Sequence, residues 1–363
     1  MTDFDRVAGD PVGDTVGDRI GHTVGVEDLL ESTEDEATVR RRRRWGRIAV
    51  QVSLGLLALL ILGVAGLLWN VTDSVTGSVH TVPVAALPPA PANPVGKPLT
   101  VLLLGSDLRA GADAADGVTG QRADAIMLIR FSPDRSRIDV MSIPRDSWVP
   151  IQGIGTAKIN ASLGGGPSLV VRTVQALTGI RIDHVMLMDF GGVRDLTTAL
   201  GGVTVINERA STDPRNGSHF DAGPLTLSGD RALTFVRQRY GLPGGDFDRI
   251  ARQQQLVAAI SQKLKKENLV ADPWLAKDVV QVVADSLTVD AGMTSTLMTQ
   301  ILVDIVSTPP QGVHFYTAPS AGFGVSSDGQ DYVRLDMAKF SAACLAMRTD
   351  KPILLPGTPI KLP

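Results

Sequence analysis

The feature that most constrains this chain is an uncharged apolar run that follows a cluster of arginines. Residues 40–44 are all arginine, and the run 48–69 is dominated by Leu, Ile, Val, Ala and Gly. At about 1.5 Å per residue a helix of this length spans roughly 33 Å, enough to cross a hydrocarbon core about 30 Å thick. Trp45 and Trp69 stand at the two ends, where interfacial tryptophans belong. The run therefore predicts one transmembrane helix over residues 48–69.

The arginine cluster also predicts the orientation of this helix. Positive charge collects on the cytoplasmic side, so the N-terminus is expected in the cytoplasm and everything after residue 70 outside. A cleaved signal peptide fits less well, because the run is too long and begins too far into the chain. The arginines also fit a nucleic-acid segment, but the adjacent span and the net charge of −3 argue against nucleic acid as a partner. We expect a single-pass protein of the cell membrane that contacts the lipid bilayer.

Two segments around the predicted span lack the pattern of a folded core. Residues 1–47 form a cytoplasmic tail that is acidic before the arginine cluster, and too few of its side chains are apolar to offset the entropy of ordering, so we expect disorder. Residues 70–98 contain six prolines and predict a semi-extended spacer outside the membrane.

Residues 99–350 predict one α/β domain. The apolar runs resemble strands buried on both faces, and they alternate with helical patterns. The expected strands are 99–104, 125–131, 138–143 and 313–317, and the expected helices are 167–177, 248–265, 275–286 and 294–307. The fold class is therefore a single α/β/α layered domain with a central mixed β-sheet flanked by helices. Residues 351–363 contain four prolines and predict an irregular tail.

Charged residues stand at the ends of the predicted strands, which is where open α/β sheets place their ligands. Asp107 follows the first strand, Arg122 and Asp124 precede the second, and Arg145 follows the third. Further candidates come later in the chain: Lys158, Arg237, Arg239, Arg249, Arg252 and Gln253.

The spacing of these residues predicts a phosphate site. Arg237 and Arg239 lie two apart on a segment that we interpret as extended, so they point the same way. Arg249, Arg252 and Gln253 share one face of a predicted helix. Guanidinium groups match phosphate oxygens bidentately, so converging arginines suit a diphosphate. Each residue alone is more often a surface ion pair or a turn former, and Asp146 and Asp246 also fit simple capping roles.

Asp107 and Asp124 fit a hard cation, Mg²⁺ or Mn²⁺, because both offer the oxygen ligands such an ion prefers. Other chemistries lack their motifs: the sequence has no Walker A loop and no Gly-x-Ser-x-Gly elbow. The single cysteine, Cys344, lies in an apolar run and predicts a core residue, and His184 predicts a structural residue at a strand end.

Taken in order, these motifs make the chain similar to the LytR-CpsA-Psr family of cell-wall glycopolymer ligases. The matching segments are Leu102–Asp107, Arg122–Leu128, Ser142–Ser147, Lys158–Ala161, Asp195 with Gly201–Val203, Gly229–Leu233, Val236–Arg239 and Asp248–Gln254. Each is weak alone, but the ordered set is specific. One departure is Ala123, where the family usually has serine, and we expect this change to tune the site.

The resemblance implies an extracytoplasmic phosphotransferase. Such an enzyme moves a glycopolymer phosphate from a polyprenyl-pyrophosphate carrier to a hydroxyl of peptidoglycan and releases polyprenyl phosphate. The catalytic candidates are Asp124, Arg122, Arg145, Arg237 and Arg239. The same four arginines, with Lys158, Arg249, Arg252 and Gln253, are expected to bind the pyrophosphate. Asp107 and Asp124 are the expected metal ligands, and Asp124 is the leading candidate to activate the acceptor. An apolar tunnel between sheet and helices would take the prenyl chain.

Three other classes remain open from the sequence. A polyprenyl-pyrophosphate hydrolase would use the same phosphate pocket with water as the acceptor. A membrane-anchored wall-binding or regulatory protein would carry the fold without catalysis. A cytoplasmic DNA-binding regulator fits least, because the charge asymmetry places the domain outside.

Overall fold

The computed structural model describes residues 80–87, 96–106, 123–267, 281–282, 285, 287–358 and 360. The chain divides into two compact units, Met1–Gly66 and Leu67–Pro363, and every described residue belongs to the second. In these ranges no helix is long and apolar enough to cross a membrane. The predicted tail 1–47 and span 48–69 lie outside the described residues, as do Asp107 and Arg122.

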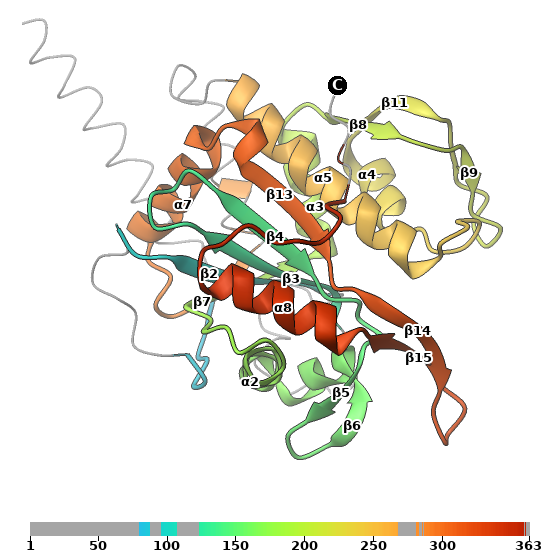
Figure 1. Ribbon diagram of the computed structural model, residues 1–363. Coiled ribbons are helices and arrows are strands. Elements are labelled where there is room, and N and C mark those ends of the chain that lie inside the picture. The colour runs from blue at the N-terminus through green and yellow to red at the C-terminus, as the bar shows by residue number, and fades with distance from the viewer. Residues whose placement is uncertain are drawn as a thin grey trace, which may run out of the picture. The chain divides into compact units, whose positions relative to one another are not determined.

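A seven-stranded mixed sheet forms the centre of the described unit (Figure 1). In spatial order its strands are β1 (His80–Val82), β12 (Leu287–Asp290), β7 (His184–Asp189), β2 (Leu99–Ser106), β3 (Ala123–Phe131), β4 (Ile138–Ser142) and β13 (Val313–Thr317). The pairs β1–β12, β7–β2 and β4–β13 are parallel, whereas β12–β7, β2–β3 and β3–β4 are antiparallel. All five residues of β4 are buried, as expected of a strand covered on both faces.

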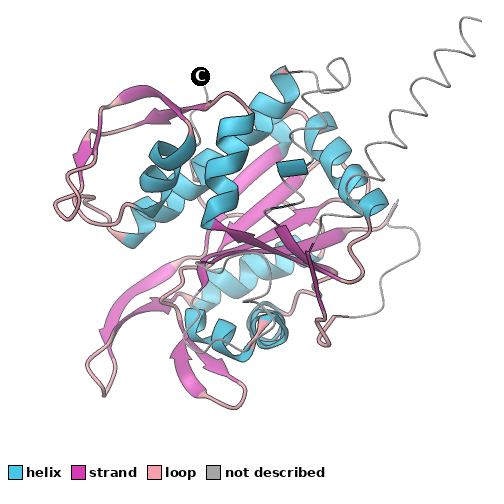
Figure 2. Ribbon diagram, turned by 180° about the vertical axis from the view of Figure 1, so that it is seen from behind, coloured by secondary structure: helices cyan, strands magenta, loops and turns pink. Residues whose placement is uncertain are grey.

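Helices cover both faces of this sheet (Figures 1 and 2). On one face, α2 (Pro167–Thr178) and α8 (Met337–Arg348) share an apolar core with β2, β3 and β4. On the other, α5 (Asp246–Lys266) and α7 (Ser295–Ser307) pack against the same sheet through residues such as Ala258 and Ile301. The predicted mixed α/β domain, with a central sheet flanked by helices, is confirmed. Of the predicted helix 275–286, only residues 281, 282 and 285 are described, and all three are helical.

A smaller lobe packs beside α5 and carries a core of its own. It contains α3 (Phe190–Ala199), β8 (Val203–Asn207), β9 (Ser211–Thr212), β10 (His219–Phe220), β11 (Gly223–Leu227) and α4 (Gly229–Arg237). The rings of Phe220 and Phe235 meet edge to face in its centre, with centroids 5.2 Å apart. Here one prediction is wrong in part: of the segment with Arg237 and Arg239 that was predicted to be extended, Arg237 is the last residue of α4, and the residues after it are not helical. Ala232, Phe235 and Val236 are buried at helical spacing, and this packing determines the conformation.

Two hairpins, one after β4 and one after β13, project from the central sheet (Figure 1). The first is β5 (Trp148–Ile151) with β6 (Gly155–Lys158), followed by the 3₁₀ segment Ile159–Gly165. The second is β14 (Ser320–Val325) with β15 (Asp331–Leu335). The Val333 amide donates to the Asp146 carbonyl at 2.9 Å, which joins the second hairpin to the loop after β4. A short 3₁₀ turn, Pro310–Gly312, precedes β13.

Several single-residue predictions are confirmed. Cys344 is buried in α8, and burial raises the pKa of its thiol to about 12. His184 begins β7 and contacts Asp290 of β12, with Nδ1 3.1 Å from the carboxylate. Residues 351–358 have no regular structure. One segment differs from expectation: β1 lies within the range 70–98 that the prolines predicted to be spacer, and it pairs with β12 at the sheet edge.

Candidate functional site

The ends of β2, β7 and β4 and the start of β3 lie together at one end of the strands, which we call the site edge of the sheet. Ser106 at the end of β2 is paired with Ala123 at the start of β3 and with Asp189 at the end of β7. β4 ends at Ser142 beside Met127 of β3, so the loop that follows it reaches the same edge. This convergence brings Asp124 and the Pro144–Ser147 loop together although some twenty residues separate them in sequence.

Arg145 is the centre of the charged cluster at this edge. Its Nη1 donates to Oδ1 of Asp124, and its Nε lies 3.8 Å from carboxylate oxygens of both Asp146 and Asp246. Lys158 approaches Asp146 from β6, with Nζ 3.5 Å from Oδ1. One guanidinium therefore faces three carboxylates, and Lys158 contacts one of them, Asp146.

Burial and charge act against each other on Arg145. Burial alone would lower the pKa of its guanidinium, but the charges of Asp124, Asp146 and Asp246 outweigh burial and raise it. The guanidinium of Arg145 therefore keeps its positive charge, as arginine does in proteins in general.

A second ion pair lies deeper, at the start of α5. Arg249 Nη2 contacts Oδ1 of Asp246, and both residues are buried. Burial raises the pKa of Asp246 and lowers that of Arg249, and the charge of each partner opposes the shift. The two residues lie three apart on one helical turn, so the helix itself sets their distance.

Several buried polar atoms of this cluster have no hydrogen-bond partner among the described residues. They are Nε of Arg145, Nε and Nη2 of Arg249, and both carboxylate oxygens of Asp246. Two of these atoms, Nη2 of Arg249 and Oδ1 of Asp246, contact each other as an ion pair, which leaves Nε of Arg145, Nε of Arg249 and Oδ2 of Asp246 without a close partner in the described part of the chain. Buried polar atoms are almost always satisfied in native proteins, so a group of them at the site edge indicates a ligand site. The donors among them suit an oxyanion.

Not every predicted residue joins this cluster. Arg252 is buried, but its guanidinium donates to Gln238, Asn207 and Ser211 in the small lobe, at 2.6, 3.2 and 2.7 Å. It also lies over the Phe235 ring, 4.2 Å from the centroid. Gln253 is buried one turn after Arg249 and shares its face of α5. Arg249 and Gln253 therefore belong together, whereas Arg252 is engaged elsewhere.

Arg237 and Arg239, at the C-terminal end of α4, differ in their exposure to solvent. Arg237 is the last residue of α4 and is exposed, while Arg239 is half-buried. The charge of Arg239 influences the pKa of Asp246 and of Arg249, so Arg239 lies within range of the buried pair. The residue between the two arginines, Gln238, is buried and turns to Arg252.

The metal prediction can be compared with only one of its two ligands. Asp124 gives one carboxylate oxygen to Arg145, and carboxylate oxygens are the ligands that Mg²⁺ prefers. Asp107 lies outside the described residues. Within the described ranges no group of three or more His, Cys, Asp or Glu side chains is arranged to hold a metal ion.

Asp246 is the site residue that sequence reasoning did not assign. Its position before a helix fitted a capping role, but its carboxylate instead faces Arg145 and Arg249. The N-cap of α5 is Gly245, and no side chain caps it; Asp248, in the first turn, accepts from the Gly244 amide at 2.8 Å. The i,i+3 spacing of Asp246 and Arg249 was the available signal, but the burial that makes the pair informative was not visible in the sequence.

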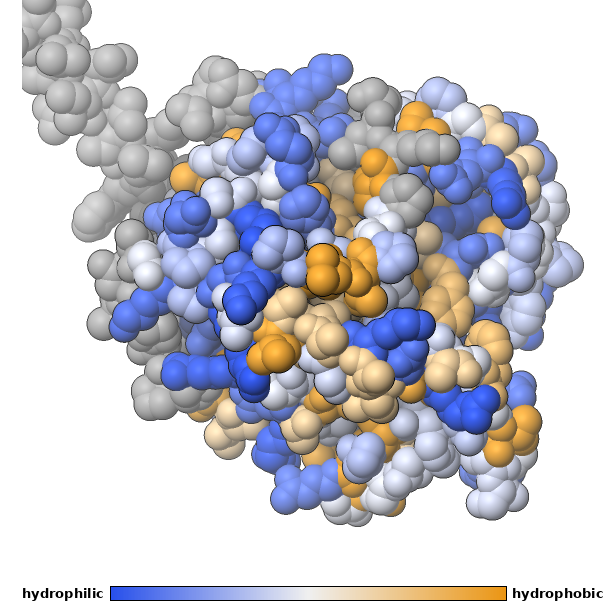
Figure 3. Space-filling view, in the orientation of Figure 1, coloured by the Kyte–Doolittle hydropathy of each residue, from blue (hydrophilic) through white to orange (hydrophobic). Residues whose placement is uncertain are grey.

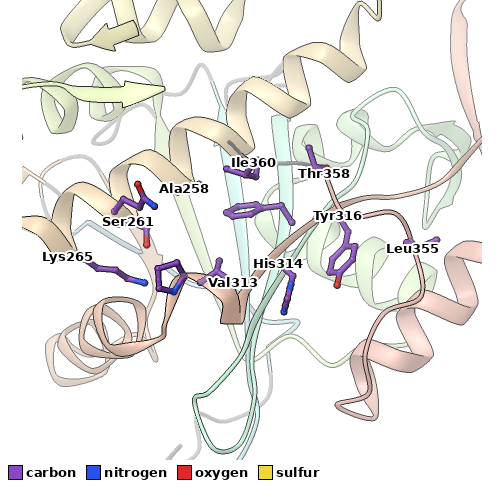
Figure 4. Close-up of a pocket in the computed structure, with 13 residues that line it drawn as sticks. Ala258, Ser261, Lys265, Val313, His314, Tyr316, Leu355, Thr358 and Ile360 are labelled. Carbon is purple, nitrogen blue, oxygen red and sulfur yellow. The ribbon is translucent and has the colours of Figure 1, made fainter. Parts of the chain in front are cut away.

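A separate cavity of about 300 Å³ lies farther along α5 (Figure 4). Ser261 and Lys265 of α5, His314 and Tyr316 of β13, and Leu355 of the C-terminal segment line it. Apolar side chains also gather in the middle of the face in Figure 3, where Figure 1 places β13 and the C-terminal residues. The cavity lies between sheet and helix, but its lining includes charged and polar groups. The expected apolar tunnel stays a prediction.

Comparison with known proteins identifies the family. A model described as the LytR_cpsA_psr family matches residues 76–348, about three quarters of the chain. The chain therefore belongs to the LytR-CpsA-Psr family, and the resemblance predicted from its motifs is confirmed.

Two relatives and one solved structure illustrate the relationship. The polyisoprenyl-teichoic acid–peptidoglycan teichoic acid transferase TagU of Bacillus mycoides is 34% identical over 219 residues, covering 58% of this chain and 69% of the relative. The cell wall biosynthesis protein LcpA of Corynebacterium glutamicum is 29% identical over 282 residues, covering 67% of this chain and 54% of the relative. Protein gbs0355 of Streptococcus agalactiae shares the fold, with a TM-score of 0.61 at 24% identity, covering 73% of this chain and 93% of that structure.

Proposed function

We propose that this protein is a phosphotransferase that moves a glycopolymer phosphate from a polyprenyl-pyrophosphate carrier to peptidoglycan and releases polyprenyl phosphate. The observation that carries the proposal is the cluster of Asp124, Arg145, Asp246 and Arg249 at the site edge, with buried guanidinium nitrogens that lack hydrogen bonds within the described residues. Family membership supports it, because relatives carry the name of teichoic acid transferases.

The reaction needs charge neutralisation and alignment more than covalent chemistry from the protein. An acceptor hydroxyl oxygen attacks the phosphorus next to the glycan, and the bond from that phosphorus to the bridging oxygen breaks. The bridging oxygen keeps the electron pair and leaves as part of polyprenyl phosphate. Arg145 and Arg249 face the developing charge, with Arg239 nearby. Asp124, which Arg145 holds in place, takes the proton of the acceptor hydroxyl.

The remaining assignments extend this scheme. Arg122 and Arg237 are proposed to bind the pyrophosphate with Lys158 and Gln253. Asp107 and Asp124 would hold Mg²⁺ or Mn²⁺, and a bound divalent ion would neutralise pyrophosphate oxygens. Activity that persists after chelation and dialysis, and does not rise when Mg²⁺ is restored, would remove the metal from the scheme.

The decisive experiment reconstitutes the full chain in lipid nanodiscs with a synthetic lipid-pyrophosphate glycan, Mg²⁺ and peptidoglycan oligomers. A product mass equal to peptidoglycan plus glycan phosphate identifies a ligase. Free glycan phosphate without a peptidoglycan product identifies a hydrolase, and no reaction supports a non-enzymatic role. Arg145→Ala should abolish the product, whereas Arg172→Ala, which changes an exposed arginine of α2, is the matched control.

We further propose that residues 48–69 anchor the protein once in the cell membrane, with the N-terminus in the cytoplasm and the catalytic domain outside. The arginine cluster at 40–44 supports this orientation. A membrane-impermeant reagent applied to intact cells should label a tag at the C-terminus and leave a tag at the N-terminus unlabelled. Labelling of the N-terminal tag alone would reverse the orientation.

A further inference from the structure

The ring of Tyr240 contacts two arginine side chains, and one of them, Arg239, lies within electrostatic range of the buried Asp246–Arg249 pair. The guanidinium carbon of Arg215 is 3.6 Å from the centroid of the Tyr240 ring, and that of Arg239 is 5.9 Å from it. A cation over an aromatic face is attracted to the ring, so Tyr240 holds two positive groups near each other. Neither Arg215 nor Tyr240 belongs to the site as described above.

The backbone around these side chains is fixed by close packing. Gly241 has a φ of +75°, and a Cβ at this position would overlap the carbonyl oxygen of Thr212. Gln238 donates from Nε2 to the Tyr240 carbonyl at 3.0 Å. The loop after α4 and the β9–β10 hairpin, which Figure 1 places at the outer edge of the small lobe, therefore form one unit. Within it, the Arg215 amide donates to Asp213 at 2.9 Å, which sets the turn that presents Arg215.

Neither guanidinium forms an ion pair within the described part of the chain, although the charge of Arg239 acts on Asp246. The two acidic side chains nearest to Arg215 in sequence are engaged with other groups. Asp213 accepts from the backbone of Arg215, and Asp221 lies 3.2 Å from His219. Two like charges that share one ring repel each other, and an anion bound between them would remove this repulsion.

The order of burial gives this arrangement a direction. Arg249 is 5% exposed, Arg239 is half-buried and Arg215 is exposed. The line from Arg249 through Arg239 and Tyr240 to Arg215 therefore leads outward from the proposed reaction centre. A group bound at Arg215 belongs to a part of the substrate beyond the reacting phosphates.

We infer that Arg215, Tyr240 and Arg239 form a second anion subsite, which binds a phosphodiester of the donor glycan close to its lipid pyrophosphate. This inference rests on the proposed function and narrows its substrate class to anionic glycopolymers. Arg215 acts as a specificity residue and takes no part in the chemical step. Guanidinium groups recognise phosphodiester oxygens bidentately, whereas a neutral sugar would require an open aromatic face, and Arg215 already covers one face of Tyr240.

The test compares two synthetic donors with the full chain in nanodiscs. Both carry the same prenyl chain, pyrophosphate and first sugars, and only one carries a phosphodiester after those sugars. Arg215→Ala should lower kcat/KM for the phosphodiester donor by roughly tenfold or more, the size of one charge-assisted hydrogen bond. For the neutral donor the change should stay within about twofold. Arg209→Ala, which changes another exposed arginine of the same lobe, is the control and should leave both donors unaffected.

Further variants separate charge from shape. Arg215→Lys keeps the positive charge but loses the two parallel N–H donors of the guanidinium group. Its kcat/KM for the phosphodiester donor should therefore lie between those of wild type and Arg215→Ala. Tyr240→Leu should show the same selective loss, and Tyr240→Phe, which keeps the ring, should not. An equal loss for both donors, or no loss for either, would overturn the inference.

Direct binding distinguishes this inference from the proposed function. The affinity of each donor for the protein is measured with fluorescent donors and no acceptor. Selective weakening of the phosphodiester donor by Arg215→Ala, without any transfer to peptidoglycan, would reject the ligase and keep the subsite. Transfer that proceeds with no selectivity in either assay would keep the ligase and reject the subsite.

Discussion

Asp246 and Arg249 form an ion pair one helical turn apart at the start of α5, with only 9% and 5% of their surfaces exposed. A buried pair of this kind contributes little net stability, because desolvation offsets most of the attraction. Because the Asp246 carboxylate also lies 3.8 Å from Nε of Arg145, the pair ties Arg249 to the proposed phosphate site.

The pair predicts strongly non-additive stability effects. Asp246→Asn leaves Arg249 buried without its counter-charge, and the expected loss is about 3–5 kcal/mol of unfolding free energy. Arg249→Met alone should cost a similar amount, while the double variant should lose much less than the sum. Denaturant unfolding of the wild type, the two single variants and the double variant gives the four unfolding free energies of this double-mutant cycle. Additive losses would show that the two charges do not depend on each other.

Substitution of Arg145 is expected to lower kcat/KM strongly, by an amount that depends on the replacing side chain. Because its guanidinium serves Asp124 and the phosphate site together, Arg145→Ala should lower kcat/KM by at least about a hundredfold. Arg145→Lys should recover only part of the activity, since an ammonium lacks the planar fork. Lys158→Ala, which loses a 3.5 Å contact to Asp146, should have a smaller effect. Full activity in Arg145→Lys would mean that charge alone is required.

The sequence predicted the parts of this protein whose residues carry their own pattern. Largely apolar runs identified β2, β3 and β4, because strands buried on both faces carry few polar side chains, and β13 was also predicted. The edge strand β1 was missed, because three residues within a proline-rich stretch carry too little pattern. The β14–β15 hairpin was missed as well, since its strands alternate around glycines such as Gly324, which lies against the Tyr332 ring.

The sequence predicted which residue types lie at the candidate site better than it predicted which side chains contact each other there. Strand ends placed Asp124 and Arg145 correctly at the site edge, because topology follows from the strands. The partners of buried side chains depend on packing that no local pattern encodes. The contact of Asp246 with Arg145 was therefore not predicted, and neither was the hydrogen bond of Arg252 to Gln238 in the small lobe.

Asp290 predicts an acid-dependent loss of stability. Burial alone would raise its pKa, but the hydrogen bond from His184 and the amides of Val185 and Gly292 outweigh burial, so the folded pKa lies below the ordinary value of 3.8. A depressed pKa contributes stability that is present above about pH 4 and is lost as the pH falls through the folded pKa. Asp290→Asn should therefore lower stability at pH 7 and flatten its decline below about pH 4.

The control for this prediction is Asp285→Asn, since Asp285 is exposed and accepts from Gln281 in the same short segment. It should change stability by less than about 1 kcal/mol at any pH. Unfolding followed by tryptophan fluorescence between pH 3 and 7 measures both variants. A decline in Asp290→Asn as steep as that of wild type would show that other carboxylates govern the acid response.

Substitution of Arg252 tests whether this residue has a structural role or binds phosphate. Burial lowers the pKa of its guanidinium to about 10, and its donors are taken by Gln238, Asn207 and Ser211. Arg252→Ala should therefore cost about 3 kcal/mol of unfolding free energy, because it leaves buried acceptors unsatisfied and empties the space over Phe235. Activity per folded molecule should fall by less than about tenfold, since Arg145 and Arg249 keep their positions. A variant with unchanged melting behaviour but a hundredfold lower kcat/KM would instead place Arg252 on the pyrophosphate.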